Sequence, residues 1–215
     1  MAERKRPRRT RERILETSLA LFNRAGAPHV TTSDIADEMN ISPGNLYYHF
    51  RNREAIVLEL YAAYEARVAP LYADPGGRHP GVEDLWLWLH VLQEAMWDYR
   101  FLYRDLTELA SRDRKLRMRF AALLRRGAST VVQWCRGMAE VGTMQISERE
   151  IDALADNVML IAAYWPSYDR NRRATPGDDP DPDPGRAAYQ VLSLFGPYFD
   201  DDARAHLARL SAAYL

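Results

Sequence analysis

Two short helices joined by a tight turn are predicted at residues 31–53, and this pattern constrains the fold more than any other part of the chain. Thr31, followed three residues later by Asp34, fits the acidic form of a capping box and starts the first helix. After a short break, Ser42 as N-cap and Pro43 at the first helical position start the second helix. The first helix places three apolar side chains on its buried face: Ile35, Ala36 and Met39.

The second helix carries more polar and aromatic side chains than its own packing explains. Leu46 and Phe50 are four residues apart and point together into a small core. The other faces then display a mixed set: Pro43, Gly44, Asn45, Tyr47, Tyr48 and His49. Such a helix is typical of the recognition helix of a helix-turn-helix, which lies in the major groove of DNA. The alternatives are an ordinary surface helix and a helix-turn-helix that contacts protein.

Each of these side chains suits a particular contact with DNA. Asn45 is suited to hydrogen-bond a base edge such as that of adenine, and Gly44 lets the backbone approach a phosphate. The aromatic side chains at 47–49 are suited to phosphates, sugars and thymine methyl groups. Three hydroxyls at helix N-termini favour phosphate, because the helix dipole attracts anions there: Thr31, Thr32 and Ser42. Arg53 follows Asn52, the predicted N-cap of the next helix, and a cation there favours a phosphate partner.

The second helix and the residues after it resemble the signature of the TetR family of bacterial transcriptional regulators. The sequence from 42 to 56 is Ser-Pro-Gly-Asn-Leu-Tyr-Tyr-His-Phe-Arg-Asn-Arg-Glu-Ala-Ile. The resemblance extends back over 14–22 and the turn at Gly26, so it covers roughly the first quarter of the chain. It implies DNA contacts at five positions: Thr32, Asn45, Tyr47, Tyr48 and His49. The family usually has lysine where this chain has Arg53, and the positive charge is the same.

Charge is distributed unevenly along the 215-residue chain, whose net charge is only −1. Residues 1–53 carry ten Lys+Arg and six Asp+Glu, a net charge of +4, whereas the remainder carries 19 and 24, a net charge of −5. A basic head on an acidic body is expected when only one end binds a polyanion. The basic arm Arg4–Arg9 is predicted to be disordered until it meets phosphates or the minor groove, through Arg8 and Arg9. The alternative is a solubilising tail.

The whole chain is predicted to be all-α. We expect a three-helix DNA-binding domain at 1–53 and a helical effector-binding and dimerisation domain at 54–215, because no segment has a convincing strand pattern. Apolar periodicity predicts the following helices: 53–72, 82–111, 112–141, one starting at the Ser147–Glu150 capping box and kinked or ended at Pro166, 186–195 and 201–215. A linker is expected at about 170–185, where the aspartates at 178–183 favour solvation over a calcium site.

Aromatic side chains of the body are the candidate walls of an effector pocket, although such stripes are more often plain core. The candidates are Trp86, Trp88, Trp97, Tyr99, Phe101, Tyr103, Trp134 and Trp165. They suit an apolar ligand, aromatic or acyl in character. A competing hypothesis is a metal-dependent sensor or enzyme built on His90, Glu94 and Asp98, for which a polar helix face is the simpler explanation. The sequence has no nucleophile elbow, phosphate loop or zinc-protease motif, so we predict no catalytic residue, metal or cofactor.

Cysteine content and hydropathy set the expected environment. Cys135 is the single cysteine, which excludes an intrachain disulfide, and its apolar neighbours predict a buried structural thiol. The sequence shows no signal peptide and no apolar run of the roughly 20 residues that a membrane span requires. The expected location is the cytoplasm.

These features together predict a sequence-specific DNA-binding transcriptional regulator. Its expected partners are double-stranded operator DNA, a second copy of the chain and an apolar or aromatic small-molecule effector. One short recognition helix contacts few bases, so a dimer on a palindromic operator supplies length and affinity. The resemblance implies a ligand-responsive repressor whose last two large helices form a four-helix dimer interface. The apolar stripes of 186–195 and 201–215 are offered for this interface, and packing within the chain is the alternative. The remaining alternative, an accessory protein with a vestigial DNA-binding head, is disfavoured by the groove-facing side chains.

Overall fold

The computed structural model describes residues 7–73, 79–175 and 183–214, and the chain there is built from helices. Regular strands are absent from these residues, in which Met144 and Phe199 form an isolated bridge. The all-α class is confirmed. Contacts group the chain into two compact units: unit 1 is Met1–Arg67 with Asp98–Arg119, and unit 2 is Val68–Trp97 with Phe120–Leu215.

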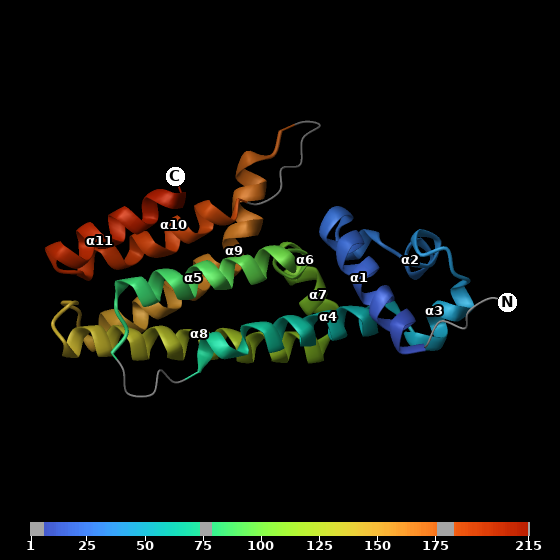
Figure 1. The fold of residues 1–215 in the computed structure, drawn as a ribbon, viewed down its shortest axis with the longest axis horizontal. Helices are drawn as coiled ribbons and strands as arrows, with labels where there is room; N and C mark the ends of the chain where they lie inside the picture. The colour runs from blue at the N-terminus through green and yellow to red at the C-terminus, as the bar shows by residue number, and fades with distance from the viewer. Residues whose placement is uncertain (1–6, 74–78, 176–182, 215) are drawn as a thin grey trace. The chain divides into compact units, whose positions relative to one another are not determined.

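Unit 1 contains the predicted helix-turn-helix (Figure 1). Its first elements are α1 (Pro7–Ala25), the 3-10 turn η1 (Ala27–His29), α2 (Thr32–Glu38), α3 (Pro43–His49) and α4 (Arg53–Val68). Its small core includes the buried side chains of Ile14, Phe22, Ile35, Leu46, Phe50 and Ile56. Between α2 and α3, Asn40 adopts a φ of +52°, a left-handed conformation that asparagine tolerates better than most residues. This residue turns the chain from the supporting helix into the exposed one.

The prediction of one continuous helix at 82–111 is wrong. The structure has three helices there: α5 (Val82–Asp98), α6 (Phe101–Arg104) and α7 (Leu106–Arg112). Asn23 of α1 supplies the physical reason for the first break. Its Nδ2 donates to the Asp98 carbonyl at 2.7 Å, and its Oδ1 accepts from the Phe101 N–H at 3.1 Å. A buried amide from α1 thus satisfies backbone groups at the break between α5 and α6.

Unit 2 holds most of the helical body. Its remaining elements are η2 (Ala69–Tyr72), most of α8 (Arg114–Glu140), α9 (Glu148–Arg173), α10 (Pro184–Phe195), η3 (Gly196–Tyr198), α11 (Asp201–Ser211) and η4 (Ala212–Tyr214). The predicted capping box of α9 is present: the Ser147 N–H donates to Glu150 Oε2 at 2.8 Å, and the Glu150 N–H donates back to Ser147 Oγ at 3.4 Å. The apolar stripes of α10 and α11 are buried within the chain through Ala188, Leu192, Phe195, Ala203 and Leu207.

Helix α9 continues through Pro166 to Arg173, so the helix does not end at the proline. Figure 1 shows its last part, in orange, turned away from the direction of its first part. The linker expected at about 170–185 is therefore shorter at both ends, because α9 still includes Arg173 and Asp183 already caps α10. Its centre, together with most of the possible calcium ligands, lies outside the described residues.

Cys135 lies fully buried in α8. Burial raises the pKa of its thiol to about 12, so the group keeps its proton at neutral pH. The prediction of a buried structural thiol is confirmed. As for membranes, none of the helices among the described residues has the length and apolar character needed to cross a bilayer.

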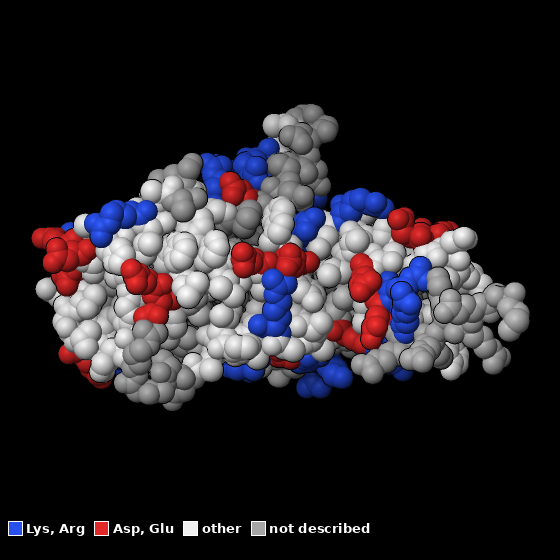
Figure 2. Space-filling view, in the orientation of Figure 1, with Lys and Arg blue, Asp and Glu red and all other residues white. Residues whose placement is uncertain are grey.

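The two units differ in charge more strongly than the head and the body defined from the sequence. Unit 1 carries 18 Lys+Arg and 13 Asp+Glu, a net charge of +5, whereas unit 2 carries 11 and 17, a net charge of −6. The segment 98–119 alone adds seven basic and four acidic residues to unit 1. In unit 2, acidic side chains gather over the first turn of α11, where Asp201 and Asp202 follow the N-cap Asp200 (Figure 2).

Candidate nucleic-acid interface

The start of α2 has the predicted geometry. The Asp34 N–H donates to Thr31 Oγ1 at 3.2 Å, and the Thr31 N–H donates to Asp34 Oδ2 at 2.8 Å. These hydrogen bonds hold the pKa of the Asp34 carboxyl below its usual value, so the group remains ionised at neutral pH. The helix dipole also stabilises a carboxylate at this position, which lies in the first turn of the helix. Thr31 therefore serves as a cap, on an exposed surface where its predicted phosphate contact stays a prediction.

Helix α3 presents the predicted exposed face. Ser42 Oγ accepts the Asn45 N–H at 3.2 Å and Pro43 occupies the first turn, so the helix begins where the sequence indicated. Leu46 is fully buried, whereas the side chains around it are exposed: Ser42, Pro43, Gly44, Asn45, Tyr47 and Tyr48. Tyr48 is 79% exposed and its ring lies edge-on to that of His49, which is half-buried.

The two helices of the motif are joined at their exposed side by Thr32 and Tyr47. Thr32 Oγ1 lies 3.2 Å from the Tyr47 hydroxyl, so the first turn of α2 and the middle of α3 present two hydroxyls together. Tyr47 keeps 53% of its surface exposed despite this contact. Paired hydroxyls beside a helix N-terminus can donate to phosphate oxygens, which suits the predicted role of both residues.

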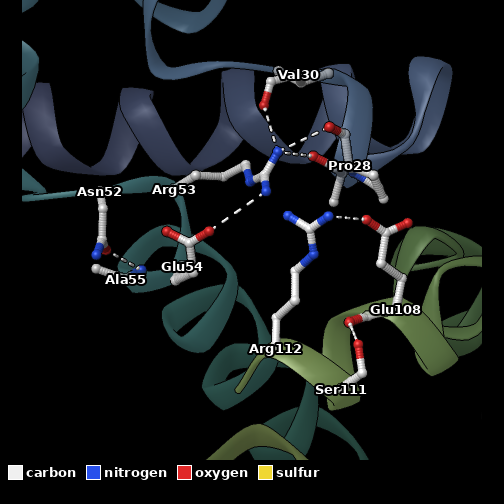
Figure 3. A network of polar contacts seen from close by, with 10 residues as sticks. Pro28, Val30, Asn52, Arg53, Glu54, Ala55, Glu108, Ser111 and Arg112 are labelled. Atoms are coloured by element: carbon white, nitrogen blue, oxygen red, sulfur yellow. Dashed lines mark hydrogen bonds and ion pairs between the residues drawn. The ribbon is translucent and has the colours of Figure 1, made fainter.

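Arg53 makes structural contacts that the sequence did not predict (Figure 3). Its side chain is 18% exposed, and its Nη1 donates to the carbonyls of Ala27 and Pro28 at 3.0 Å and of Val30 at 3.4 Å. Its Nη2 lies 3.4 Å from Glu54 Oε1. Backbone carbonyls of the turn between α1 and α2 thus stabilise the cation that starts α4. These contacts give Arg53 a structural role, which is to position this turn.

Replacing Arg53 by methionine is expected to lower the free energy of unfolding by about 1.5–3 kcal/mol, because three carbonyls lose a charged donor. Arg53→Lys should recover most of this loss, since an ammonium carries three donors. Urea unfolding followed by circular dichroism measures both values. A methionine variant with unchanged stability but weakened DNA binding would return Arg53 to the phosphate-contacting set.

The same turn and the end of α1 are also held by Arg104 and Asp105, two residues that the sequence did not point to. The Arg104 guanidinium donates to the carbonyls of Phe22 at 2.6 Å and Asn23 at 3.0 Å, and its Nε lies 3.1 Å from Asp105 Oδ1. Asp105 Oδ2 in turn accepts the Ala27 N–H at 2.8 Å. The side chains of this Arg104–Asp105 pair are only 7% and 10% exposed. An adjacent Arg-Asp dipeptide in a helical stretch carries no local signal of such a role.

The basic arm is partly helical. Helix α1 begins at Pro7, so the expectation of disorder is wrong for residues 7–9, and proline at a helix start explains why. Arg9 is exposed, and Arg8 lies in the same first turn. Residues 1–6 lie outside the described part of the chain.

The candidate effector-contacting aromatics are divided between the two units. Tyr99, Phe101 and Tyr103 belong to unit 1, where the Phe101 ring lies 5.3 Å from that of Phe22 and the Tyr103 hydroxyl bonds that of Tyr64. The other candidates belong to unit 2: Trp86, Trp88, Trp97, Trp134 and Trp165. The break after α5 separates the two sets, because it commits α6 to the packing of α1.

His90, Glu94 and Asp98 do not form a metal site. His90 Nδ1 lies 2.9 Å from the Tyr214 hydroxyl and its ring stacks on Trp86 at 5.2 Å, whereas Asp98 pairs with Arg67. Across the described part of the chain, no three His, Cys, Asp or Glu side chains are grouped so that they could hold a metal ion. The metal-based alternative thus loses its structural basis.

A helix-turn-helix with an exposed second helix, followed by an all-helical body, defines the class of helix-turn-helix DNA-binding proteins. Family models agree with this class and extend over most of the chain. Residues 14–60 match the model described as bacterial regulatory proteins, tetR family, and residues 63–207 match the model described as bacterial transcriptional repressor. The chain belongs to the TetR family.

Individual relatives are similar to different extents. A crystal structure of a TetR-family regulator from Marinobacter aquaeolei VT8 is 32% identical with a TM-score of 0.83, and the match covers 95% of this chain and 98% of that one. The regulator TcmR of Streptomyces glaucescens is 34% identical over 34% of this chain and 33% of its own length. The probable acrEF/envCD operon repressor of Escherichia coli K12 is 36% identical over 25% of this chain and 24% of its own. The matches to these curated relatives thus span a third of their length or less.

Proposed function

We propose that this protein is a ligand-responsive transcriptional repressor that binds a palindromic operator as a dimer. The observation that carries the proposal is the division of α3 into a buried face and an exposed one. Leu46 and the following Phe50 hold the helix on the core, while Asn45, Tyr47 and Tyr48 remain free to enter a major groove. Membership of the TetR family supports the same function.

The proposed DNA contacts follow from exposure and chemistry. Asn45 is assigned to a base edge, and Gly44 to the close approach of backbone to phosphate. The remaining contacts to sugar, phosphate and methyl groups are assigned to Thr31, Thr32, Ser42, Pro43, Tyr47, Tyr48 and His49, with Arg8 and Arg9 from the first turn of α1. Arg53 is excluded from this set, because its guanidinium is engaged by three backbone carbonyls.

The proposed dimer uses α9. The stripes of α10 and α11 that sequence analysis offered for dimerisation are largely consumed by packing within the chain. Helix α9 instead exposes three large side chains on one face, four residues apart: Leu160 at 58%, Tyr164 at 45% and Tyr168 at 55%. An exposed apolar stripe of this kind is typical of an interface between subunits.

The proposed switch acts through the segment 98–119. This segment belongs to unit 1, and its two ends continue into α5 and α8, which supply unit 2. A ligand that displaced α5 or α8 would therefore pull on Arg104 and Asp105, which hold the turn before α2. The ligand must bind the DNA-competent and DNA-free states with unequal affinity, or no switching occurs.

DNA selection from a random-sequence pool, with the recovered complexes sized by light scattering, tests the proposal. We expect an enriched palindrome bound by two chains, since each α3 contacts few base pairs. Tyr164→Glu on α9 should yield monomers with much weaker binding, whereas Glu148→Gln at the exposed start of the same helix serves as a matched control. Salt-sensitive binding without an enriched sequence would contradict the assignment as a specific regulator.

A further inference from the structure

Unit 2 contains buried hydrogen-bond donors that have no acceptor. Among the described residues of this unit, four side-chain nitrogens are buried without a hydrogen-bond partner: Trp86 Nε1, Gln93 Nε2, Trp134 Nε1 and Trp165 Nε1. Gln93 as a whole residue is only 6% exposed. All four atoms are donors, and the same unit leaves no described side-chain acceptor buried and unpaired. Native proteins rarely bury polar groups without a hydrogen-bond partner, so four unpaired donors in one unit need an explanation.

Trp88 shows that an indole in this unit can be satisfied. It lies on α5 between Trp86 and Gln93 in sequence, and its Nε1 donates to the Leu71 carbonyl at 3.0 Å. The unpaired nitrogens therefore do not reflect a general property of buried tryptophans in unit 2. They mark positions where the chain itself provides no acceptor.

Water alone is a poor solution for these donors. A water molecule that accepts from one of them still has two hydrogens of its own to place, and the described side chains of unit 2 offer no unpaired buried acceptor, which leaves only backbone carbonyls. A carbonyl or ether oxygen accepts without bringing a donor. The unpaired donors of unit 2 are thus better matched by an oxygen that belongs to an organic molecule.

The charged residues of unit 2 indicate which net charge the ligand should carry. Among the described residues of unit 2 no lysine, arginine or histidine is buried, so an anionic group that reached Gln93 would meet no buried counter-charge. His90, which stacks on Trp86, has a side chain that is 41% exposed. Asp169 is the one buried carboxylate in the described part of unit 2, and it is already paired with Arg172 at 2.9 Å and Arg173 at 2.8 Å, so a cationic ligand would lack a free buried partner. A neutral molecule meets both conditions.

The donors come from three helices that pack together. The rings of Trp88 on α5 and Trp134 on α8 lie 5.7 Å apart, which joins these two helices. Gly127 of α8 faces α9 so closely that a Cβ there would lie 2.5 Å from Met159 Sδ. Methionine is an adaptable side chain, and a movement of Met159 away from Gly127 would make room for a ligand between α8 and α9.

We propose that the effector is a neutral, largely apolar molecule carrying carbonyl or ether oxygens, bound among α5, α8 and α9 with Gln93 as a donor to one of these oxygens. This inference rests on the proposed ligand-responsive function and names the class of its ligand. It predicts two kinds of result, one for the protein alone and one for matched probes.

In the ligand-free protein, Gln93→Met is expected to raise the melting temperature by about 2–8 °C, because it removes an unpaired buried donor at similar volume. Two paired groups serve as controls. Asn23→Leu should lower the melting temperature, since that buried amide is hydrogen-bonded at both ends. Trp88→Phe should lower it more than Trp134→Phe does, because only Trp88 leaves an acceptor behind. A lower melting temperature for Gln93→Met would overturn the inference.

The probes share one fused-ring skeleton and differ in charge and oxygen: tetralin, 1-tetralone, 2-aminotetralin and tetralin-2-carboxylate. Tryptophan fluorescence titration should give 1-tetralone at least about 10-fold tighter binding than tetralin, the worth of one good hydrogen bond. Gln93→Met should remove this preference. Equal binding of tetralin, tighter binding of either charged probe, or no binding of 1-tetralone at millimolar concentration would each overturn the inference.

Failure of this inference and failure of the proposed function give different results. The selection of DNA sequences uses ligand-free protein and does not depend on the probes. If the protein enriches a palindrome but prefers a charged probe, the proposed regulator function is supported and the proposed neutral effector is contradicted. If the protein binds 1-tetralone through Gln93 but enriches no DNA sequence, the proposed ligand site is supported and the proposed sequence-specific DNA binding is contradicted.

Discussion

Tyr47→Ala should weaken operator binding by about 30- to 1,000-fold, if each recognition helix loses about 1–2 kcal/mol and the dimer carries two. The side chain is 53% exposed and its hydroxyl lies 3.2 Å from Thr32 Oγ1, so truncation removes both an aromatic contact and one of two paired hydroxyls. The fold should persist, because Leu46 and Phe50 supply the apolar contacts of α3. Fluorescence anisotropy with the selected operator measures the affinity, and circular dichroism checks the melting temperature.

Tyr47→Phe separates the two contributions. This variant keeps the ring and loses only the hydroxyl next to Thr32, so its affinity should fall between those of the wild type and of Tyr47→Ala. If Tyr47→Ala binds the operator as tightly as the wild type, α3 does not meet DNA through this face. The assignment of Asn45 and Tyr48 would then fail with it.

The second large effect is the loss of stability expected when the buried Arg104–Asp105 pair is broken. Asp105→Ala should lower the free energy of unfolding by about 3–5 kcal/mol, because it leaves the Arg104 guanidinium buried without its carboxylate and the Ala27 N–H without its acceptor. The melting temperature should fall by about 6–20 °C. Glu108→Ala offers a matched control on α7, since its pair with Arg112 at 2.8 Å is exposed and worth less than about 1 kcal/mol.

The same pair links stability to function. Asp105→Asn keeps an oxygen that can accept the Ala27 N–H but removes the charge, so it should fold better than Asp105→Ala while binding DNA less tightly than the wild type. Urea unfolding and operator titration of the three proteins measure the two properties separately. Equal stability of Asp105→Ala and Glu108→Ala would show that Arg104 and Asp105 do not hold the turn before α2.

Local chemistry explains why much of the helix-turn-helix could be predicted. Each correct boundary rests on partners within three residues, as in the caps at Thr31 and Ser42, the Ala55 N–H donating to Asn52 Oδ1 at 2.9 Å, and the Ser147–Glu150 box. A side chain and a backbone group that are this close in sequence meet whatever the rest of the chain does. The buried face of α3 followed from the same kind of evidence, because spacing on a helix fixes which residues share a face.

The errors share a different origin. The helix expected at 82–111 is interrupted by Asn23, which lies 75 residues before the backbone carbonyl it bonds, and periodicity carries no trace of that amide. A cation at a helix start needs a partner, and the sequence does not reveal that carbonyls of 27–30 provide one for Arg53. Composition likewise does not reveal that the break between α5 and α6 divides the aromatic residues between two units.

By itself the sequence determined the all-helical class, the helix-turn-helix and the exposed face of α3, because caps and apolar spacing act over three to seven residues. Only the tertiary structure decided where α5 ends, which groups hold the turn before α2, and which buried donors lack an acceptor. These features depend on the backbone groups and side chains that distant segments bring within hydrogen-bonding distance. Burial makes each such contact consequential, since a polar group removed from water must find its partner inside the protein.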